Sequence, residues 1–134
     1  MAVTSAAPGH RARLTGGLLA WYGVLGGAVA WAAHLFVGWG VDELTCAAGI
    51  DRVAGLPPRA VIGLAVVVPA LVTVGALLAA VLTWRRTALP RHADDDPPYA
   101  RARLLALVGI FGNLLFLAII VLGGIAVLVL PSCR

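Results

Sequence analysis

The chain has 134 residues, of which 61% are hydrophobic and 12% are charged. Soluble domains are about a quarter charged, so this composition excludes an ordinary water-soluble globule and indicates a membrane protein. The formal net charge is +4, with ten arginines and no lysine. Because the arginines flank apolar runs, they predict membrane topology and headgroup contacts, and they do not predict nucleic-acid binding.

Three segments are apolar and carry no charged residue, namely 17–41, 61–84 and 104–130. Each exceeds the roughly 20 residues that a helix needs to cross a bilayer. Their apolar runs are continuous, whereas strands of a membrane barrel alternate between apolar and polar residues. We therefore predict an all-α integral membrane protein, in which residues 1–134 form a single domain of three transmembrane helices joined by loops 42–60 and 85–103.

The arginines are unevenly divided between the two sides that these spans define. Seven lie on the side of the N-terminus and three on the other side. Positive charge favours the inner side, so we expect the N-terminus and loop 85–103 inside, and loop 42–60 and the C-terminus outside. A cleaved signal peptide is a competing interpretation of the first segment, because "AVA" at 28–30 resembles a cleavage site. That segment, however, continues well past the roughly 7–15 residues of a signal core.

The second segment contains Pro69, which removes one backbone donor and crowds the carbonyl of Ala65. We expect a kink there, eased by a hydrogen bond from Thr73 to the preceding turn.

The first segment carries a histidine, His34, in an apolar surrounding. At 3.6 residues per turn, His34 shares one face of the helix with three glycines and one tryptophan, namely Gly23, Gly27, Gly38 and Trp31. The glycine pair at spacing four permits close helix packing, so we expect the imidazole to face protein. Two roles stay open for His34. It is either a structural histidine bonded to a carbonyl or to Asn113, or a ligand or proton relay. Ligation of haem or copper would need further ligands from another copy or another protein.

The third segment contains Asn113, whose amide can bond another helix, with Gly109 and Gly112 as a close packing surface. Its depth differs from that of His34 by about 10 Å, which disfavours a direct bond. Aromatic residues near the segment ends, Trp21, Tyr22, Trp39 and Trp84, are typical of a membrane interface.

The two cysteines, Cys46 and Cys133, both fall just beyond the predicted outer ends of spans. An oxidising compartment would favour a disulfide between them. Asp42 and Glu43 mark the exit of the first span. No nucleophile with a base and no metal-ligand spacing is present in the sequence, so we expect neither an enzyme nor a metal site.

The run "GVLGGAVAWAAHLFVGWGVDELTC" at 23–46 resembles small uncharacterised bacterial membrane proteins encoded near haem–copper terminal oxidases. Trp31, His34 and Cys46 match that pattern, and the terminal "PSC" echoes it. The resemblance implies a multi-pass accessory or assembly protein of the respiratory chain in the bacterial inner (plasma) membrane.

These observations favour a non-catalytic accessory or assembly subunit of a larger membrane complex, whose partners are the lipid bilayer and another membrane subunit or further copies of the chain. Two alternatives remain: a haem- or copper-handling redox protein that uses His34, or a small oligomeric transporter that uses Asp42 and Glu43.

Overall fold

The computed structural model describes residues 10–87 and 97–129, which form three long α-helices. They are α1 (His10–Cys46), α2 (Pro58–Thr87) and α3 (Pro97–Val129). Within these helices, Thr15–Cys46, Pro58–Thr87 and Ala100–Val127 are long and apolar enough to cross a membrane. The predicted all-helical fold with three such helices is therefore confirmed, and it favours a multi-pass membrane protein.

The helices are longer than the apolar runs from which they were predicted. The first apolar run ends at residue 41, whereas α1 continues for more than a turn, through Asp42 and Glu43 to Cys46. The third run begins at residue 104, whereas α3 begins at Pro97, a residue type that helices accept in their first turn. Charged residues thus end the apolar run without ending the helix.

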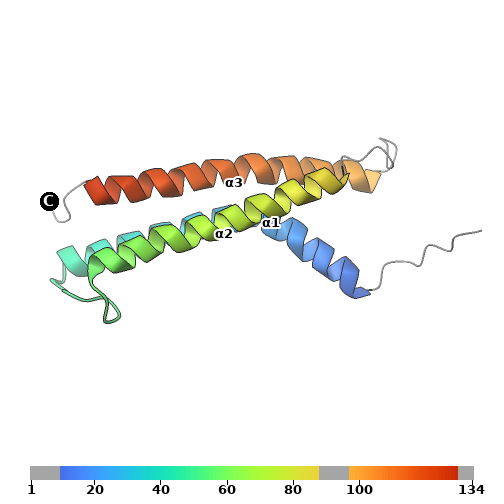
Figure 1. The fold of residues 1–134 in the computed structure, drawn as a ribbon. Helices are drawn as coiled ribbons and strands as arrows, with labels where there is room; N and C mark the ends of the chain where they lie inside the picture. The colour runs from blue at the N-terminus through green and yellow to red at the C-terminus, as the bar shows by residue number, and fades with distance from the viewer. Residues whose placement is uncertain (1–9, 88–96, 130–134) are drawn as a thin grey trace, which may run out of the picture.

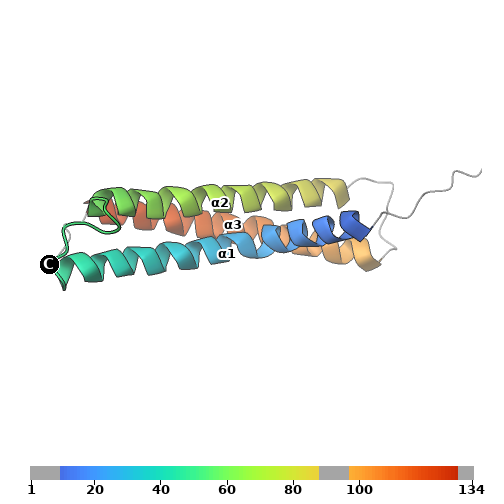
Figure 2. The ribbon, with the colours of Figure 1, turned by 90° about the horizontal axis from the view of Figure 1, so that it is seen from below.

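The three helices run antiparallel in sequence order and lie side by side (Figures 1 and 2). Each helix contacts both others. One end of the bundle, here the Cys46 end, holds the C-terminus of α1 and the start of α2 (Figure 1). The opposite end, here the Arg101 end, holds the C-terminus of α2 and the start of α3 (Figure 1).

Between α1 and α2 the chain makes a tight turn at Val53–Leu56. The backbone of Val53 and Leu56 pairs in both directions at 3.0 Å. Ala54 and Gly55 between them have φ values of 51° and 78°. Two consecutive positive φ values are those of a type I′ turn, which reverses the chain direction between Val53 and Leu56.

The buried face of α2 is a stripe of small residues: Ala65, Pro69, Thr73, Ala76 and Ala80. Steps of three and four residues keep these side chains on one side of the helix. Glycines of α1 lie against them, and a Cβ at Gly23 would come within 3.2 Å of the backbone nitrogen of Ala80. The helices therefore approach closely through small residues, which is how helices associate in lipid.

α3 approaches α1 just as closely at Gly109. A Cβ at this position would lie 2.5 Å from the carbonyl oxygen of Gly23. Gly38 and Gly112 behave differently, because a Cβ on either would meet no atom within 4 Å. Of the glycines expected to pack, Gly23, Gly27 and Gly109 lie between helices of this chain, and Gly38 and Gly112 border open space.

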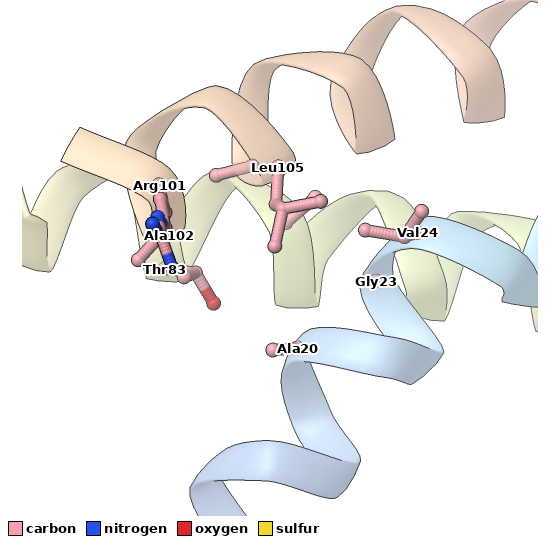
Figure 3. Close-up of a pocket in the computed structure, with 9 residues that line it drawn as sticks. Ala20, Gly23, Val24, Thr83, Arg101, Ala102 and Leu105 are labelled. Carbon is pink, nitrogen blue, oxygen red and sulfur yellow. The ribbon is translucent and has the colours of Figure 1, made fainter. Parts of the chain in front are cut away.

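The bends of the helices differ from expectation. α2 runs without a sharp bend along its length, although it contains Pro69 (Figures 1 and 2). α1 contains no proline, yet its N-terminal part turns away from α2 (Figure 1). The turn lies close to Gly23, and Ala20 already belongs to the diverging part (Figure 3).

We predict that Gly27→Ala destabilises the bundle, because the added methyl group would overlap the Oδ1 atom of Asn113. The free energy of unfolding should fall by about 1–3 kcal/mol, as for other overpacked sites. Titration of the protein in mild detergent with sodium dodecyl sulfate, followed by circular dichroism, measures this value.

Gly112→Ala is the matched control, since its methyl group meets open space in α3. It should change the free energy of unfolding by no more than about 0.5 kcal/mol. Equal destabilisation by the two variants would contradict the packing described for Gly27.

Candidate functional site

Asn113 of α3 is fully buried and bonds two backbone groups of α1. Its Oδ1 accepts the N–H of Gly27 at 2.9 Å, and its Nδ2 donates to the carbonyl oxygen of Gly23 at 2.6 Å. Nδ2 also donates to the carbonyl oxygen of Gly109 in its own helix, at 2.7 Å. The N–H of residue 27 and the carbonyl of residue 23 are the pair that a regular helix joins to each other.

The side chain of Asn113 thus bonds both backbone groups of one helical hydrogen-bond pair, at the place where α1 turns. Insertion of a side chain into the hydrogen-bond ladder is one of the recognised causes of a helix bend. Glycines 23, 26 and 27 add to it, because glycine is a poor helix former and leaves room for the amide. The bend in α1 therefore follows from local sequence together with a residue 86 positions away.

His34 of α1 bonds the carbonyl that a proline leaves unpaired. Its Nδ1 lies 2.8 Å from the carbonyl oxygen of Ala65 in α2. In a helix that carbonyl would accept from the N–H of residue 69, which is Pro69 and has none. A carbonyl oxygen can only accept, so Nδ1 carries the proton and the imidazole replaces the missing donor.

Thr73 completes this arrangement on the other side of the proline. It is fully buried, and its hydroxyl donates to the carbonyl oxygen of Pro69 at 2.8 Å. Because the gap in the ladder is filled by His34 and the next turn is braced by Thr73, α2 can contain Pro69 without a sharp bend.

The second nitrogen of His34, Nε2, faces α3. It lies 3.3 Å from the position that a Cβ of Gly123 would occupy. A metal ion on a histidine nitrogen sits about 2.0–2.1 Å away and needs further ligands around it. Because Nδ1 is bonded to the carbonyl of Ala65, any ligand role of His34 would have to use Nε2, which lies beside Gly123 of α3.

Within the described residues, no group of three or more His, Cys, Asp and Glu side chains could hold a metal ion. No hydrogen bond joins His34 to Asn113, both of which the structure describes. Asn113 bonds α1 at Gly27, seven residues before His34, which is about 10 Å along the helix axis.

Two aromatic residues of α1, Trp31 and Tyr22, contact the other two helices. The ring of Trp31 lies 5.6 Å from that of Phe116 in α3, tilted by 36°. Its Nε1 is buried and has no hydrogen-bond partner among the described residues. The hydroxyl of Tyr22, expected at the membrane interface, instead donates to the carbonyl oxygen of Val72 near the middle of α2, at 2.8 Å.

Cys46 closes α1, with its Sγ 3.6 Å from Oδ1 of Asp42. Cys133 lies outside the described residues. Asp42 and Glu43 are exposed at the Cys46 end of the bundle.

At the Arg101 end, the bend of α1 leaves a cavity of about 210 Å³ between the three helices (Figure 3). Its walls come from α1, α2 and α3 in turn: Ala20, Gly23, Val24, Ala80, Thr83, Arg101, Ala102, Leu105 and Ala106. Most of these residues are small and apolar, and Arg101 is the one charged residue among them. The cavity therefore joins an apolar interior to a guanidinium group.

Comparison of the chain with protein-family models, curated proteins and solved structures finds no significant match.

The pairing of His34 with the carbonyl of Ala65 can be tested by a double-mutant cycle with Pro69. His34→Leu should lower the free energy of unfolding by about 0.6–2 kcal/mol, the range for hydrogen bonds between membrane helices. Pro69→Ala returns a backbone N–H to that carbonyl, so the same His34→Leu change should cost less in this background. Unfolding in sodium dodecyl sulfate measures both costs.

A coupling energy of at least about 0.5 kcal/mol is the expected result for residues that share one partner. An equal cost of His34→Leu with and without Pro69 would show that the imidazole does not act through the carbonyl.

Proposed function

We propose that this protein is a non-catalytic accessory or assembly subunit of a larger membrane complex, with a respiratory oxidase as the first complex to test. The observation that carries the proposal is the use of its buried polar side chains. His34, Thr73 and Asn113 all bond helix backbone. His34 joins α1 to α2, Asn113 joins α3 to α1, and Thr73 bonds the backbone of its own helix. These buried polar groups thus serve the packing of the helices, as we expect for a structural subunit.

The surface of the bundle supports association with another membrane protein. In the apolar window of each candidate span, only 22–28% is buried within the chain. Small residues on outer surfaces are where a second helix can approach closely, and Gly38 and Gly112 have open space around them. In this proposal, Gly38 and Gly112 pack against the partner subunit.

The proposed orientation places the N-terminus on the inner side of a bacterial plasma membrane. It is supported by the seven arginines on that side against three on the other. The Arg101 end of the bundle is then the inner end, and the Cys46 end is the outer end.

We expect the full-length protein, purified in mild detergent from its own membranes at native expression, to migrate in a complex larger than one chain. Gly112→Leu should release it from that complex, because the larger side chain blocks the outer surface of α3. The measurement is native gel electrophoresis followed by identification of the co-purified membrane subunits. Phe111→Leu, an exchange of one exposed apolar side chain for another, is the control.

A chain that migrates as a lone monomer, together with unchanged oxidase assembly after deletion of its gene, would refute the proposal. The same preparation tests the competing haem or copper role of His34, since a Soret band or bound copper would favour it. The transporter role would be favoured if the protein transports a substrate and the double variant Asp42→Asn, Glu43→Gln loses this transport.

We further propose that Cys46 and Cys133 form a disulfide that ties the end of α1 to the C-terminal tail. The described part of the chain contains no free cysteine, and Cys133 is the only other cysteine in the sequence. A bridge on the outer side would lie in an oxidising compartment, where disulfides persist.

Thiol labelling of the unfolded protein should therefore modify neither cysteine before reduction and both after it. The variant with Cys133→Ser should expose Cys46 to the label without any reductant. Full labelling of Cys46 in the unreduced native chain would contradict the bridge.

A further inference from the structure

We propose that the cavity at the bend of α1 is a binding site for one anionic phospholipid, with an acyl chain between the helices and the phosphate on Arg101. This site is separate from the proposed role in a larger complex. It follows from the shape of the cavity, from its lining and from the charge at its rim.

The size of the cavity selects a thin occupant. Its volume of about 210 Å³ is smaller than the roughly 300–1,000 Å³ of pockets that hold drug-sized ligands or cofactors. A helix with its side chains is about 10 Å wide and does not enter a space of that volume. An unbranched hydrocarbon chain is narrow enough to enter.

The lining matches an acyl chain. Gly23 and Val24 of α1, Ala80 of α2, and Leu105 and Ala106 of α3 supply apolar walls from all three helices. The polar atom of Thr83 is already used, since its hydroxyl donates to the carbonyl oxygen of Ala79 at 2.8 Å. The interior of the cavity therefore offers hydrophobic contact and no unused hydroxyl.

The rim supplies charge. Arg101 lines the cavity and is exposed, and no carboxylate of the described residues pairs with it. Arg85, Arg86 and Arg103 belong to the same end of the bundle. A guanidinium group binds a phosphate through two parallel hydrogen bonds, and basic pockets between transmembrane helices bind anionic headgroups.

The position along the helices brings these two parts into register with a lipid. The apolar run of α2 ends at Trp84, before two arginines, and that of α3 begins at Leu104, after two arginines. The cavity crosses this boundary, with Arg101 on the charged side and Leu105 on the apolar side. A phospholipid has the same succession of anionic headgroup and hydrocarbon chain.

The bend of α1 is what makes room for the lipid. Figure 3 shows α1 turning at Gly23, so that Ala20 lies away from α3. The amide of Asn113 bonds Gly23 at this turn. Asn113, which holds α1 to α3, is therefore also bonded at the turn that leaves room for the cavity.

Native mass spectrometry of the full-length protein tests the proposal. The protein is released from a neutral detergent after incubation with phosphatidylglycerol or phosphatidylcholine of identical acyl chains. We expect one phosphatidylglycerol per chain, bound about tenfold more tightly than phosphatidylcholine, because the choline cation of phosphatidylcholine is repelled by the arginines at this end, whereas phosphatidylglycerol carries a net negative charge. Arg101→Gln should reduce this preference to near unity.

Arg103→Gln is the matched control, because Arg103 is exposed on the same turn of α3 and does not line the cavity. It should retain the preference. Ala20→Leu fills the cavity from the diverging part of α1 and should displace both lipids about equally. Circular dichroism of each variant reports whether the helices remain folded.

Equal binding of the two lipids by the native chain would overturn the proposal, and so would an equal loss of preference in Arg101→Gln and Arg103→Gln. A second copy of the chain seated on this cavity would appear as a dimer that Ala20→Leu dissociates while lipid binding stays unchanged, which would also overturn it. These lipid measurements do not depend on the larger complex. A result that refutes the proposed function therefore does not refute the lipid site, and the reverse is also true.

Discussion

The bundle depends on one buried amide, that of Asn113, which bonds the N–H of Gly27 and the carbonyl of Gly23 across the interface between α3 and α1. Lipid offers no hydrogen bonds, so any backbone group that a bent helix frees must be satisfied by protein. Asn113 does this at the bend, and it can reach the backbone because the two residues it bonds are glycines. The bend, the close approach of α3 at Gly109 and the cavity beyond the bend are therefore parts of one arrangement.

His34 solves the same problem for α2. Pro69 leaves the carbonyl of Ala65 without its helical donor, and the imidazole of a neighbouring helix supplies one. An ionisable residue inside a span is usually a functional candidate. Here the geometry accounts for its place in structural terms, since Nδ1 faces a carbonyl that needs a donor and Nε2 faces the backbone at Gly123. Both polar residues thus repair the backbone of the helix opposite them.

The number and approximate position of the helices could be predicted from the sequence, because apolar runs of this length have few other solutions in a membrane. Contacts between helices could not. Gly23 and Gly27 predict a packing face on α1, but their spacing does not tell whether that face meets this chain or a partner. Gly38 belongs to the same face, yet a Cβ on it would meet no atom of this chain within 4 Å. The small residues of α2 at steps of three and four were a usable signal for its buried face. The sequence predicts a kink at Pro69, whereas α2 shows no sharp bend in Figures 1 and 2. A proline in a sequence shows that one backbone donor is missing, but it does not show which side chain of another helix replaces that donor.

The small bundle therefore directs its polar groups inward to the backbone, and leaves its outer surface to lipid and to a proposed partner. This arrangement depends most on the bond between Asn113 and the backbone of α1. Solid-state NMR of the full-length protein in lipid bilayers, with ¹⁵N-labelled glycine and ¹³C-labelled asparagine, measures that contact directly. The chain has one asparagine, so a through-space signal between its side-chain carbonyl carbon and a glycine amide nitrogen is unambiguous for residue 113. Gly112 precedes Asn113 in the sequence and can contribute a signal of its own, so the informative signal is the one that Gly27→Ala removes. We predict such a signal in the native chain; native and Gly27→Ala spectra without this difference would contradict the bond.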